Sequence, residues 1–424
     1  MTPSRRPPHN SAPRISSFTP HQRPPPSALR PPPSALAYDL LELAGVRAGV
    51  ALTAERLATW DADRWAATLR AAQEAGLTAP IESRLRRTGL LTGLPPAVQS
   101  AWRTERRHAV AAFAAQGHLL ARIGAAFAAA ALPVCLLKGL ALAYTVYPEP
   151  AARHVGDIDL WVAPADLPRA LGLLPALGLL RPQWDSRPAR FLLTFGKEVL
   201  FQPPGDPPPF LMVDLHWHPT APWWMRSVLH IPEAQLWATA QPLAPAGQPY
   251  LALAPTETLF YLCLHSGLGH RYEGLRWLVD LAAVLDGGGV DWAWLDDLIA
   301  GSGTGVIVWR ALDLLDGWLG RRTVARLRHP PGRLHRRLVR RRLPGYPAER
   351  SLAADAEFEL RVPWEQLVLL PGPRALIQAL ALLLWPPALW LRLRYPLLPA
   401  APLWRARLRH LSRVRRLLPG ARKT

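Results

Sequence analysis

The spacing of apolar residues changes along the chain. In residues 39–132 apolar residues recur at helical spacing, with a break at Pro95-Pro96. Pro133 ends this stretch, and the chain then alternates between short apolar runs and helical patterns. The alternation predicts strands at 134–137 and 155–162 and helices at 140–147 and 164–177.

Further short runs have strand character, and a loop of sequence P-P-G-D-P-P-P separates the last two of them. Helical spacing returns at Thr256 and continues through Asp313–Trp318. The strands expected here are 191–195, 198–202 and 210–217.

These patterns together predict an α+β protein in which helical regions flank a small mixed β-sheet. The length of 424 residues suggests two or three domains. The first part repeats R-P-P-P-S-A-L and has no acidic residue, which is typical of a disordered tail. In chain order we expect a disordered Pro/Arg-rich tail (1–36), a helical N-terminal region (37–132), an α/β core (133–250), a helical C-terminal domain (251–370) and a basic apolar C-terminal segment (371–424).

The net charge of +19 is concentrated at the two ends of the chain. Residues 1–36 hold 5 basic and no acidic residues, residues 37–320 hold 22 and 26, and residues 321–424 hold 23 and 5. A nearly neutral centre argues against nucleic-acid binding over the whole molecule, but the C-terminal part could contact phosphates or anionic lipid.

The most apolar stretch, residues 374–391, raises the question of a membrane span. Gln378 and the pair Pro386-Pro387 interrupt it, and it is barely long enough to cross a bilayer. We therefore expect no transmembrane span. The arginines that follow favour a helix packed on the body or a basic segment lying on a surface. The two cysteines cannot form a disulfide framework, which favours the cytoplasm.

The candidate chemistry lies between the first two predicted strands. In G-D-I-D-L, Asp157 and Asp159 share one face of a strand because successive side chains point to opposite faces. Paired carboxylates hold the divalent metals used in phosphoryl and nucleotidyl transfer. Lys138-Gly139 precedes them at the start of a helix, where a glycine lets backbone N–H groups approach phosphates. Lys138 is one of three lysines in a chain with 47 arginines, which favours a specific role for its ammonium.

Such a site usually has a third carboxylate on a neighbouring strand. Asp214 in M-V-D-L-H-W-H is the first candidate, with His216 and His218 on the same face, and Glu198 is the rival. Arg153 could clamp a phosphate or pair with a carboxylate. The histidines lack the spacing of a structural zinc site, so we expect ordinary hydrogen-bonded histidines.

The order of these motifs resembles the uncharacterised bacterial nucleotidyltransferase family of the DNA polymerase β-like superfamily. The resemblance covers most of residues 40–400 and includes the later motifs L-C-L-H-S and G-L-R-W-L-V-D-L. It implies Lys138, Gly139 and Arg153 at the nucleotide, Asp157 and Asp159 as metal ligands, and Asp214 as the third carboxylate that orients or deprotonates an acceptor hydroxyl. The chain departs from the wider superfamily at Leu140, where a serine or glycine is usual.

The resemblance implies a Mg²⁺- or Mn²⁺-dependent enzyme that moves a nucleoside monophosphate from an NTP, such as ATP, to an acceptor and releases pyrophosphate. The acceptor stays open among a small molecule, a peptide, a protein, a saccharide and RNA. The alternative is a non-catalytic interaction protein of the same fold that docks on anionic lipid or RNA through its basic C-terminal region.

Overall fold

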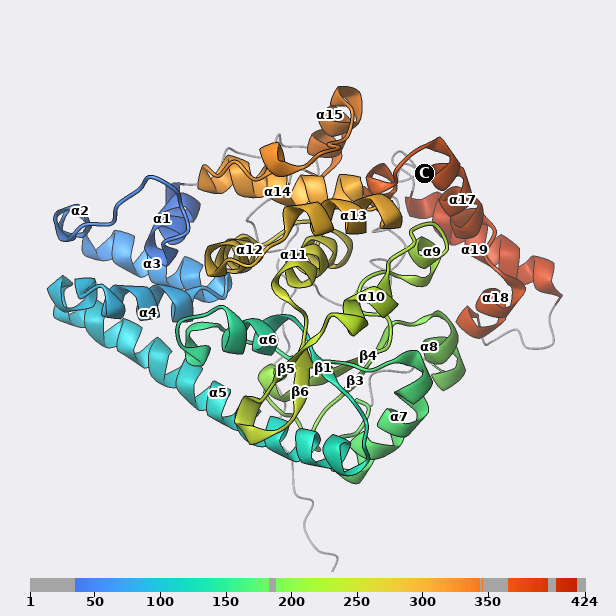
Figure 1. Ribbon diagram of the computed structural model, residues 1–424, viewed down its shortest axis with the longest axis horizontal. Helices are drawn as coiled ribbons and strands as arrows, with labels where there is room; N and C mark the ends of the chain where they lie inside the picture. Colours follow the sequence, from blue (N-terminus) through green and yellow to red (C-terminus); the bar gives the residue numbers. More distant parts are fainter. Residues whose placement is uncertain (1–34, 183–187, 344, 346–364, 396–401, 418–424) are drawn as a thin grey trace, which may run out of the picture.

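The computed structural model describes residues 35–182, 188–343, 345, 365–395 and 402–417. A single mixed β-sheet lies near the centre, and helices from both ends of the chain surround it (Figure 1). The protein is therefore of the α+β class, as the sequence predicts. Of the predicted tail, residues 1–34 lie outside the described residues, and Ala35 already begins helix α1.

The sheet has six strands in the order β3-β4-β2-β1-β6-β5. Its central pairs β2–β4 and β1–β6 are parallel, whereas β1–β2, β3–β4 and β5–β6 are antiparallel. The strands are β1 (Cys135–Leu136), β2 (Ile158–Trp161), β3 (Glu198–Phe201), β4 (Val213–His216), β5 (Gln241–Leu243) and β6 (Tyr250–Ala252).

Strand alternation gives the sheet two different faces. Ile158 and Leu160 of β2, with Val213 and Leu215 of β4, point into a hydrophobic core. Two helices supply the other side of this core, α5 (Pro96–Ala129) with Leu119, Leu120, Ile123 and Phe127, and α7 (Leu167–Ala176) with Ala170 and Leu174. The polar residues of the same strands consequently point to the opposite face.

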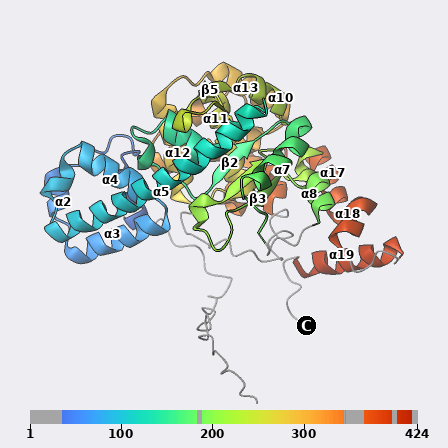
Figure 2. The same cartoon turned by 90° about the horizontal axis from the view of Figure 1, so that it is seen from below.

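In the described part of the chain, four α-helices precede α5, and α3 and α4 pack against it (Figures 1 and 2). Thr53 and Asp61 cap α2 and α3 by accepting a hydrogen bond from a backbone N–H of the first turn. The four are α1 (Ala35–Ala44), α2 (Ala54–Ala58), α3 (Ala62–Glu74) and α4 (Thr78–Arg87).

Helices after the sheet form a second and larger core, which reaches from α1 to the C-terminal half of the chain. Asp291 caps one of them, α13, by accepting hydrogen bonds from the N–H groups of Ala293 and Trp294. Gly303 and Gly320 end α13 and α14 in the left-handed region, both with φ of 71°. These helices are α11 (Pro255–Leu264), the π-helix η6 (His265–Gly269), α12 (Leu275–Gly287), α13 (Trp292–Ser302), α14 (Gly305–Leu319) and α15 (Arg333–Arg342).

The remaining helices connect or flank these layers. Helix α6 follows β1 directly, and three helices at the end of the chain form one flank of the molecule (Figure 1). Their bounds are α6 (Lys138–Thr145), α8 (Ala189–Phe195), α9 (Trp223–Arg226), α10 (Glu233–Ala238), α17 (Pro373–Leu384), α18 (Ala388–Arg394) and α19 (Leu403–Leu417).

One helix in the described part of the chain, α5, is long and apolar enough to cross a membrane by length and composition. Its C-terminal half contributes to the sheet core described above, and core helices commonly have such composition. The apolar stretch at 374–391 forms α17 and α18, which bend by 46° at Trp385–Pro387 and pass the same test only as a pair.

The structure corrects one predicted strand. Residues 191–195 belong to helix α8, which starts after Pro188. The run F-L-L-T-F has strand propensity, but helical spacing places Phe191 and Phe195 on one side, with ring centroids 5.8 Å apart. There they contact Trp390 of α18 and Trp223 of α9, so tertiary packing overrides propensity.

Smaller differences concern the edges of the sheet. The strand expected at 210–217 begins only at Val213, after a 3₁₀ turn at Pro209–Leu211. Strands β5 and β6 have three residues each and lack a clear alternating pattern, so the sequence did not predict them. Strand β6 pairs with β1, which extends the sheet beyond residue 250.

Candidate nucleotidyl-transfer site

The central parallel strands place the predicted carboxylates side by side. Asp159 of β2 lies directly opposite Asp214 of β4 in the strand register. Asp157 stands two residues before Asp159, just ahead of β2, and so shares its face. The polar face of the sheet therefore gathers Asp157, Asp159 and Asp214, which are 57 residues apart in the chain at the widest.

Asp159 is at the centre of the cluster and is almost fully buried, with 1% of its surface exposed. Its Oδ1 accepts from the Lys138 ammonium at 2.6 Å and lies 2.9 Å from His216 Nε2. Its second oxygen, Oδ2, is buried and has no hydrogen-bond partner among the described residues. A buried carboxylate oxygen without a partner is costly unless a ligand satisfies it.

His216 is the residue of the cluster to which the sequence pattern assigned no role. It follows Asp214 by two positions on β4, and lies opposite Glu198 of β3 in the antiparallel register. Its Nδ1 is 3.1 Å from Glu198 Oε2, an ion-pair distance without hydrogen-bond geometry. In the sequence, the observation that points to this role is the two-residue spacing of His216 from Asp214, which places both side chains on one face of the strand. His218 instead turns to Glu233, with Nδ1 2.8 Å from Oε2.

The two candidates for the third carboxylate occupy different positions. Asp214 lies beside Asp159. Glu198 contacts His216 on the side of the ring away from Asp159 and pairs with Lys197. Burial opposes the ionisation of Glu198, but Lys197 and His216 hold its pKa well below the usual value. The charge of Glu198 is therefore already compensated by the chain.

Lys138 and Gly139 are the first residues of α6 and follow β1 after one residue. Lys138 has a left-handed φ of 45°, a conformation that a non-glycine residue adopts at a cost. A Cβ on Gly139 would lie 2.9 Å from Val155 Cγ1, so a glycine is needed for the close contact between α6 and the segment before β2. Burial opposes protonation of Lys138, but Asp159 raises its pKa well above the usual value.

Arg153 is buried and pairs with a carboxylate from the C-terminal helices. Its Nε donates to Asp280 Oδ1 at 3.1 Å and its Nη2 to Oδ2 at 2.6 Å. Tyr147 donates its hydroxyl to the same Oδ1 at 2.7 Å. Asp280 therefore pairs with Arg153 and not with Arg276, which lies four residues before it in α12, and this pair ties the loop before β2 to α12.

The cluster carries more negative charge than the chain compensates. Burial and the carboxylates of Glu198, Asp159 and Asp157 raise the pKa of Asp214 to about 7. Burial and the charge of Asp159 also raise the pKa of Asp157. Neighbouring carboxylates disfavour the ionisation of one another, and a bound cation would remove this electrostatic repulsion.

The donor set fits a divalent cation. Ligand atoms of Asp159, Asp214 and His216 lie within 4.8 Å of one another. In the described part of the chain, these three residues form the group of His, Cys, Asp or Glu side chains that could hold a metal ion. The unpartnered Oδ2 of Asp159 is a further free ligand atom. Carboxylate oxygens suit Mg²⁺ and Mn²⁺, and a histidine nitrogen favours a transition metal such as Mn²⁺ over Mg²⁺. Asp157 is not part of this group.

Comparison with protein families gives one match. A family model described as "Uncharacterised nucleotidyltransferase" covers residues 61–320, which is more than half of the chain and includes the complete acidic cluster. The chain belongs to this nucleotidyltransferase family. No curated protein and no solved structure matches the chain significantly. The family match indicates a transferase, and the acidic cluster supplies carboxylate and imidazole groups that could hold a metal ion.

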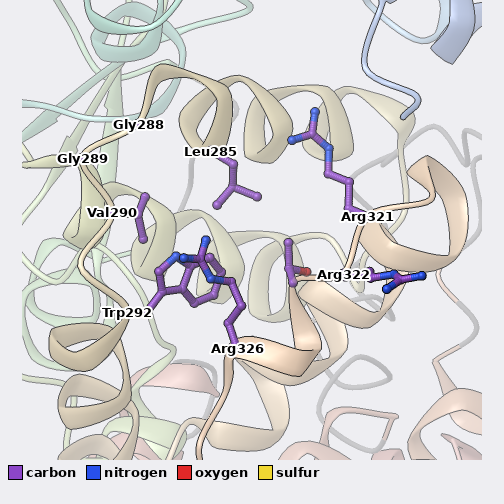
Figure 3. A pocket seen from close by; sticks show the side chains of 9 residues that line it. Leu285, Gly288, Gly289, Val290, Trp292, Arg321, Arg322 and Arg326 are labelled. Atoms are coloured by element: carbon purple, nitrogen blue, oxygen red, sulfur yellow. The ribbon is translucent and has the colours of Figure 1, made fainter. Parts of the chain in front are cut away.

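A basic cavity is lined by residues that do not belong to the acidic cluster (Figure 3). It has a volume of about 510 Å³ between the α12–α13 turn and the segment after α14. Arg326 stacks over Trp292 at 4.6 Å, and Arg321 pairs with Asp286. The lining residues are Leu285, Gly288, Gly289, Val290, Trp292, Arg321, Arg322, Thr323 and Arg326, and none of them is a carboxylate that could hold a metal.

Two histidines from the C-terminal helices pack together close to Lys138. The Nε2 atoms of His265 and His270 are 3.0 Å apart, so one ring donates to the other. Trp277 stacks on His270 with centroids 4.4 Å apart. Burial and the Lys138 ammonium lower the pKa of His270 to about 3. The hydrogen bond between these two histidines agrees with the expectation from the sequence.

We expect His270 to make folding stability dependent on pH. Its pKa is about 3 when folded and about 6.5 when unfolded, so the unfolded chain binds the proton first as pH falls. The contribution is complete above pH ~6.5 and is lost as pH falls toward ~3. Between pH ~7 and ~5 the loss should be on the order of 1–2 kcal/mol, allowing for partial exposure.

Urea unfolding of the parent chain and His270→Gln at the two pH values tests this expectation. The variant should lose less stability than the parent on acidification. His108→Gln, at an exposed position on α5, is the matched control and should behave as the parent. An equal pH dependence of parent and His270→Gln would contradict the role of His270.

Proposed function

We propose that the chain transfers a nucleoside monophosphate from an NTP to an acceptor hydroxyl. The acceptor oxygen forms a bond to the α-phosphorus, the bond between the α- and β-phosphates breaks, and pyrophosphate leaves. The observation that carries this proposal is the pairing of Asp159 with Asp214 on adjacent parallel strands, beside Lys138-Gly139 at the start of a helix. The family match supports it.

Each side chain receives a role from its position. Asp159 and Asp214, with Asp157 next to them, would hold Mg²⁺ or Mn²⁺, which supplies charge neutralisation at the phosphates. Lys138 contacts Asp159 and would pair with a phosphate of the NTP at the same site. Asp214 would orient the acceptor hydroxyl and accept its proton. Gly139 lets the first turn of α6 pack closely against Val155, which fixes the backbone N–H groups at the start of this helix beside the acidic cluster.

Arg153 receives a positioning role in this proposal. Its guanidinium is occupied by Asp280, so it fixes the segment that leads to Asp157 and β2 instead of presenting free donors to a nucleotide. Glu198 is a second positioning residue, because it fixes His216, which in turn contacts Asp159.

Several finer assignments belong to the same proposal. We assign the chain to the DNA polymerase β-like superfamily on the basis of its motif order and mixed sheet. A cytoplasmic location fits Cys135 and Cys263, which are both free and buried. Retention of the complete acidic cluster favours an enzyme over a non-catalytic protein of the same fold. ATP is one of four NTPs to be compared, and the acceptor classes named above all remain candidates.

Labelling with each of the four α-labelled NTPs tests the proposal. The protein is incubated with Mg²⁺ or Mn²⁺ and with separate small-molecule, peptide, protein, saccharide and RNA fractions of a cell extract. We expect label to enter one fraction and pyrophosphate to form in equal amount. Asp206 is an exposed carboxylate in a loop, so the control variant Asp206→Asn should have the activity of the parent. If no NTP binds, and Asp157→Ala changes nothing in cells, the proposal is wrong.

A further inference from the structure

The C-terminal helices expose apolar side chains on the face where a soluble helix normally carries charge. Eleven large apolar side chains are exposed in the described part of the chain, and six of them lie between residues 376 and 408. The most exposed of the six are Ile377 (66%), Leu408 (57%), Trp404 (56%) and Trp385 (54%). We name these four residues, with Leu384, the C-terminal apolar surface.

The two helices turn these residues outward as stripes. On α17, Ile377 and Leu384 are seven residues apart, whereas Ala379 faces the protein and is buried. On α19, Trp404 and Leu408 are four residues apart, whereas Ala406, His410 and Val414 face inward. Each helix therefore has apolar residues on two sides, one packed against the protein and one exposed.

The two helices contact each other at the C-terminal end of α17. Arg407 of α19 stacks over Trp385 at the end of α17, with its guanidinium carbon 4.0 Å from the ring centroid. His410 Nε2 lies 2.7 Å from the Leu383 carbonyl oxygen and so fixes α19 against α17. Figure 1 shows α17, α18 and α19 together on one flank, and Figure 2 shows α18 and α19 at the edge of the molecule.

The charge of this segment has a single sign. From Gln366 to the last residue, the sequence contains ten arginines, one lysine and no aspartate or glutamate. Arg405 and Arg409 are exposed on α19 next to Trp404 and Leu408. Apolar side chains are thus bordered by cations, with no carboxylate in the segment to neutralise them.

We propose that the C-terminal apolar surface docks on an anionic lipid bilayer. Leucine and isoleucine side chains gain free energy by entering the acyl region, tryptophan favours the interface, and arginines contact lipid phosphates. RNA would satisfy the arginines and could stack on tryptophan, but it offers no apolar phase for Ile377 and Leu408. The occupant that satisfies both the charges and the aliphatic side chains is the lipid surface.

Vesicle flotation of the full chain tests this inference, with phosphatidylcholine vesicles compared with vesicles that also contain phosphatidylglycerol. We expect binding to the anionic vesicles that weakens as salt is raised. Ile377→Ser with Leu408→Ser should bind at least about tenfold more weakly. Arg405→Gln with Arg409→Gln should bind roughly twentyfold more weakly at low salt.

Matched controls carry the same substitutions elsewhere on the surface. Val110→Ser with Leu180→Ser replaces exposed apolar residues, and Arg103→Gln with Arg107→Gln replaces exposed arginines of α5. Both controls should bind vesicles as the parent does. Circular dichroism of every variant establishes that the helices are retained.

Three results would overturn the inference. The first is no binding of the parent chain to anionic vesicles at low salt. The second is unchanged binding by the folded Ile377→Ser, Leu408→Ser variant. The third is tight binding of a single-stranded RNA oligonucleotide that displaces the protein from vesicles and is unaffected by the Ile377→Ser, Leu408→Ser pair, which would assign the surface to RNA.

Discussion

Replacing Asp159 by asparagine is expected to abolish nucleotidyl transfer, and circular dichroism of the variant measures whether its helices are retained. Asp159 is the buried member of the acidic cluster, and its Oδ2 has no partner among the residues that the structure describes. Asparagine keeps the shape but removes the charge that would hold a cation. Loss of a metal contribution of ~4 kcal/mol to the transition state corresponds to about a 10³-fold lower rate.

Two measurements separate this role from a structural one. Mn²⁺ binding, followed by electron paramagnetic resonance, should weaken at least about tenfold in Asp159→Asn. Pyrophosphate release in the presence of the accepted NTP should fall to background. Asp206→Asn is the control for both measurements, because its carboxylate is exposed and lies in a loop outside the cluster. Normal Mn²⁺ binding by Asp159→Asn would show that the cluster is not the metal site.

Replacing Arg153 by leucine is expected to destabilise the fold by about 3–5 kcal/mol. The substitution leaves Asp280, which is fully buried, with Tyr147 as its remaining hydrogen-bond donor among the described residues. An uncompensated buried carboxylate is far more costly than the pair itself is stabilising. Urea unfolding at neutral pH measures the change in the free energy of unfolding.

Two further variants measure how much the Arg153–Asp280 pair contributes to the free energy of unfolding. Arg169→Leu removes an exposed arginine that lies 3.5 Å from Asp166, and should cost less than about 1 kcal/mol. Asp280→Asn in the Arg153→Leu background removes the unpaired charge and should recover much of the lost stability. No loss of stability in Arg153→Leu would mean that Asp280 finds another partner or is not buried in solution.

The residues of the acidic cluster illustrate what could be predicted from the sequence. Asp157, Asp159 and Asp214 were found because strand alternation is local and fixes which side chains share a face. Lys138-Gly139 was found because a rare lysine and a glycine directly follow a predicted strand, which can be read from the local sequence. His216 was placed on the correct face, but its contact with Asp159 depends on the pairing of β2 with β4, which no local pattern encodes.

Other differences have the same origin. The run at 191–195 has strand propensity, but its aromatic rings pack against Trp223 and Trp390 only from a helix. Asp280 pairs with Arg153, 127 residues away in the chain, instead of with Arg276 in its own helix. Contacts between distant segments decide such outcomes, because a buried contact contributes more to the free energy of folding than local propensity or an exposed i, i+4 pair does.

The sequence by itself determined the α+β class, the strand that carries Asp159, and the choice of Asp157, Asp159 and Asp214 as candidate residues, because these depend on periodicity and local spacing. Only the tertiary structure decided which strands are neighbours, that Lys138 and His216 both contact Asp159, and that Arg153 is engaged by Asp280. It also decided that the apolar residues of α17 and α19 face outward, since exposure is set by what the rest of the chain covers.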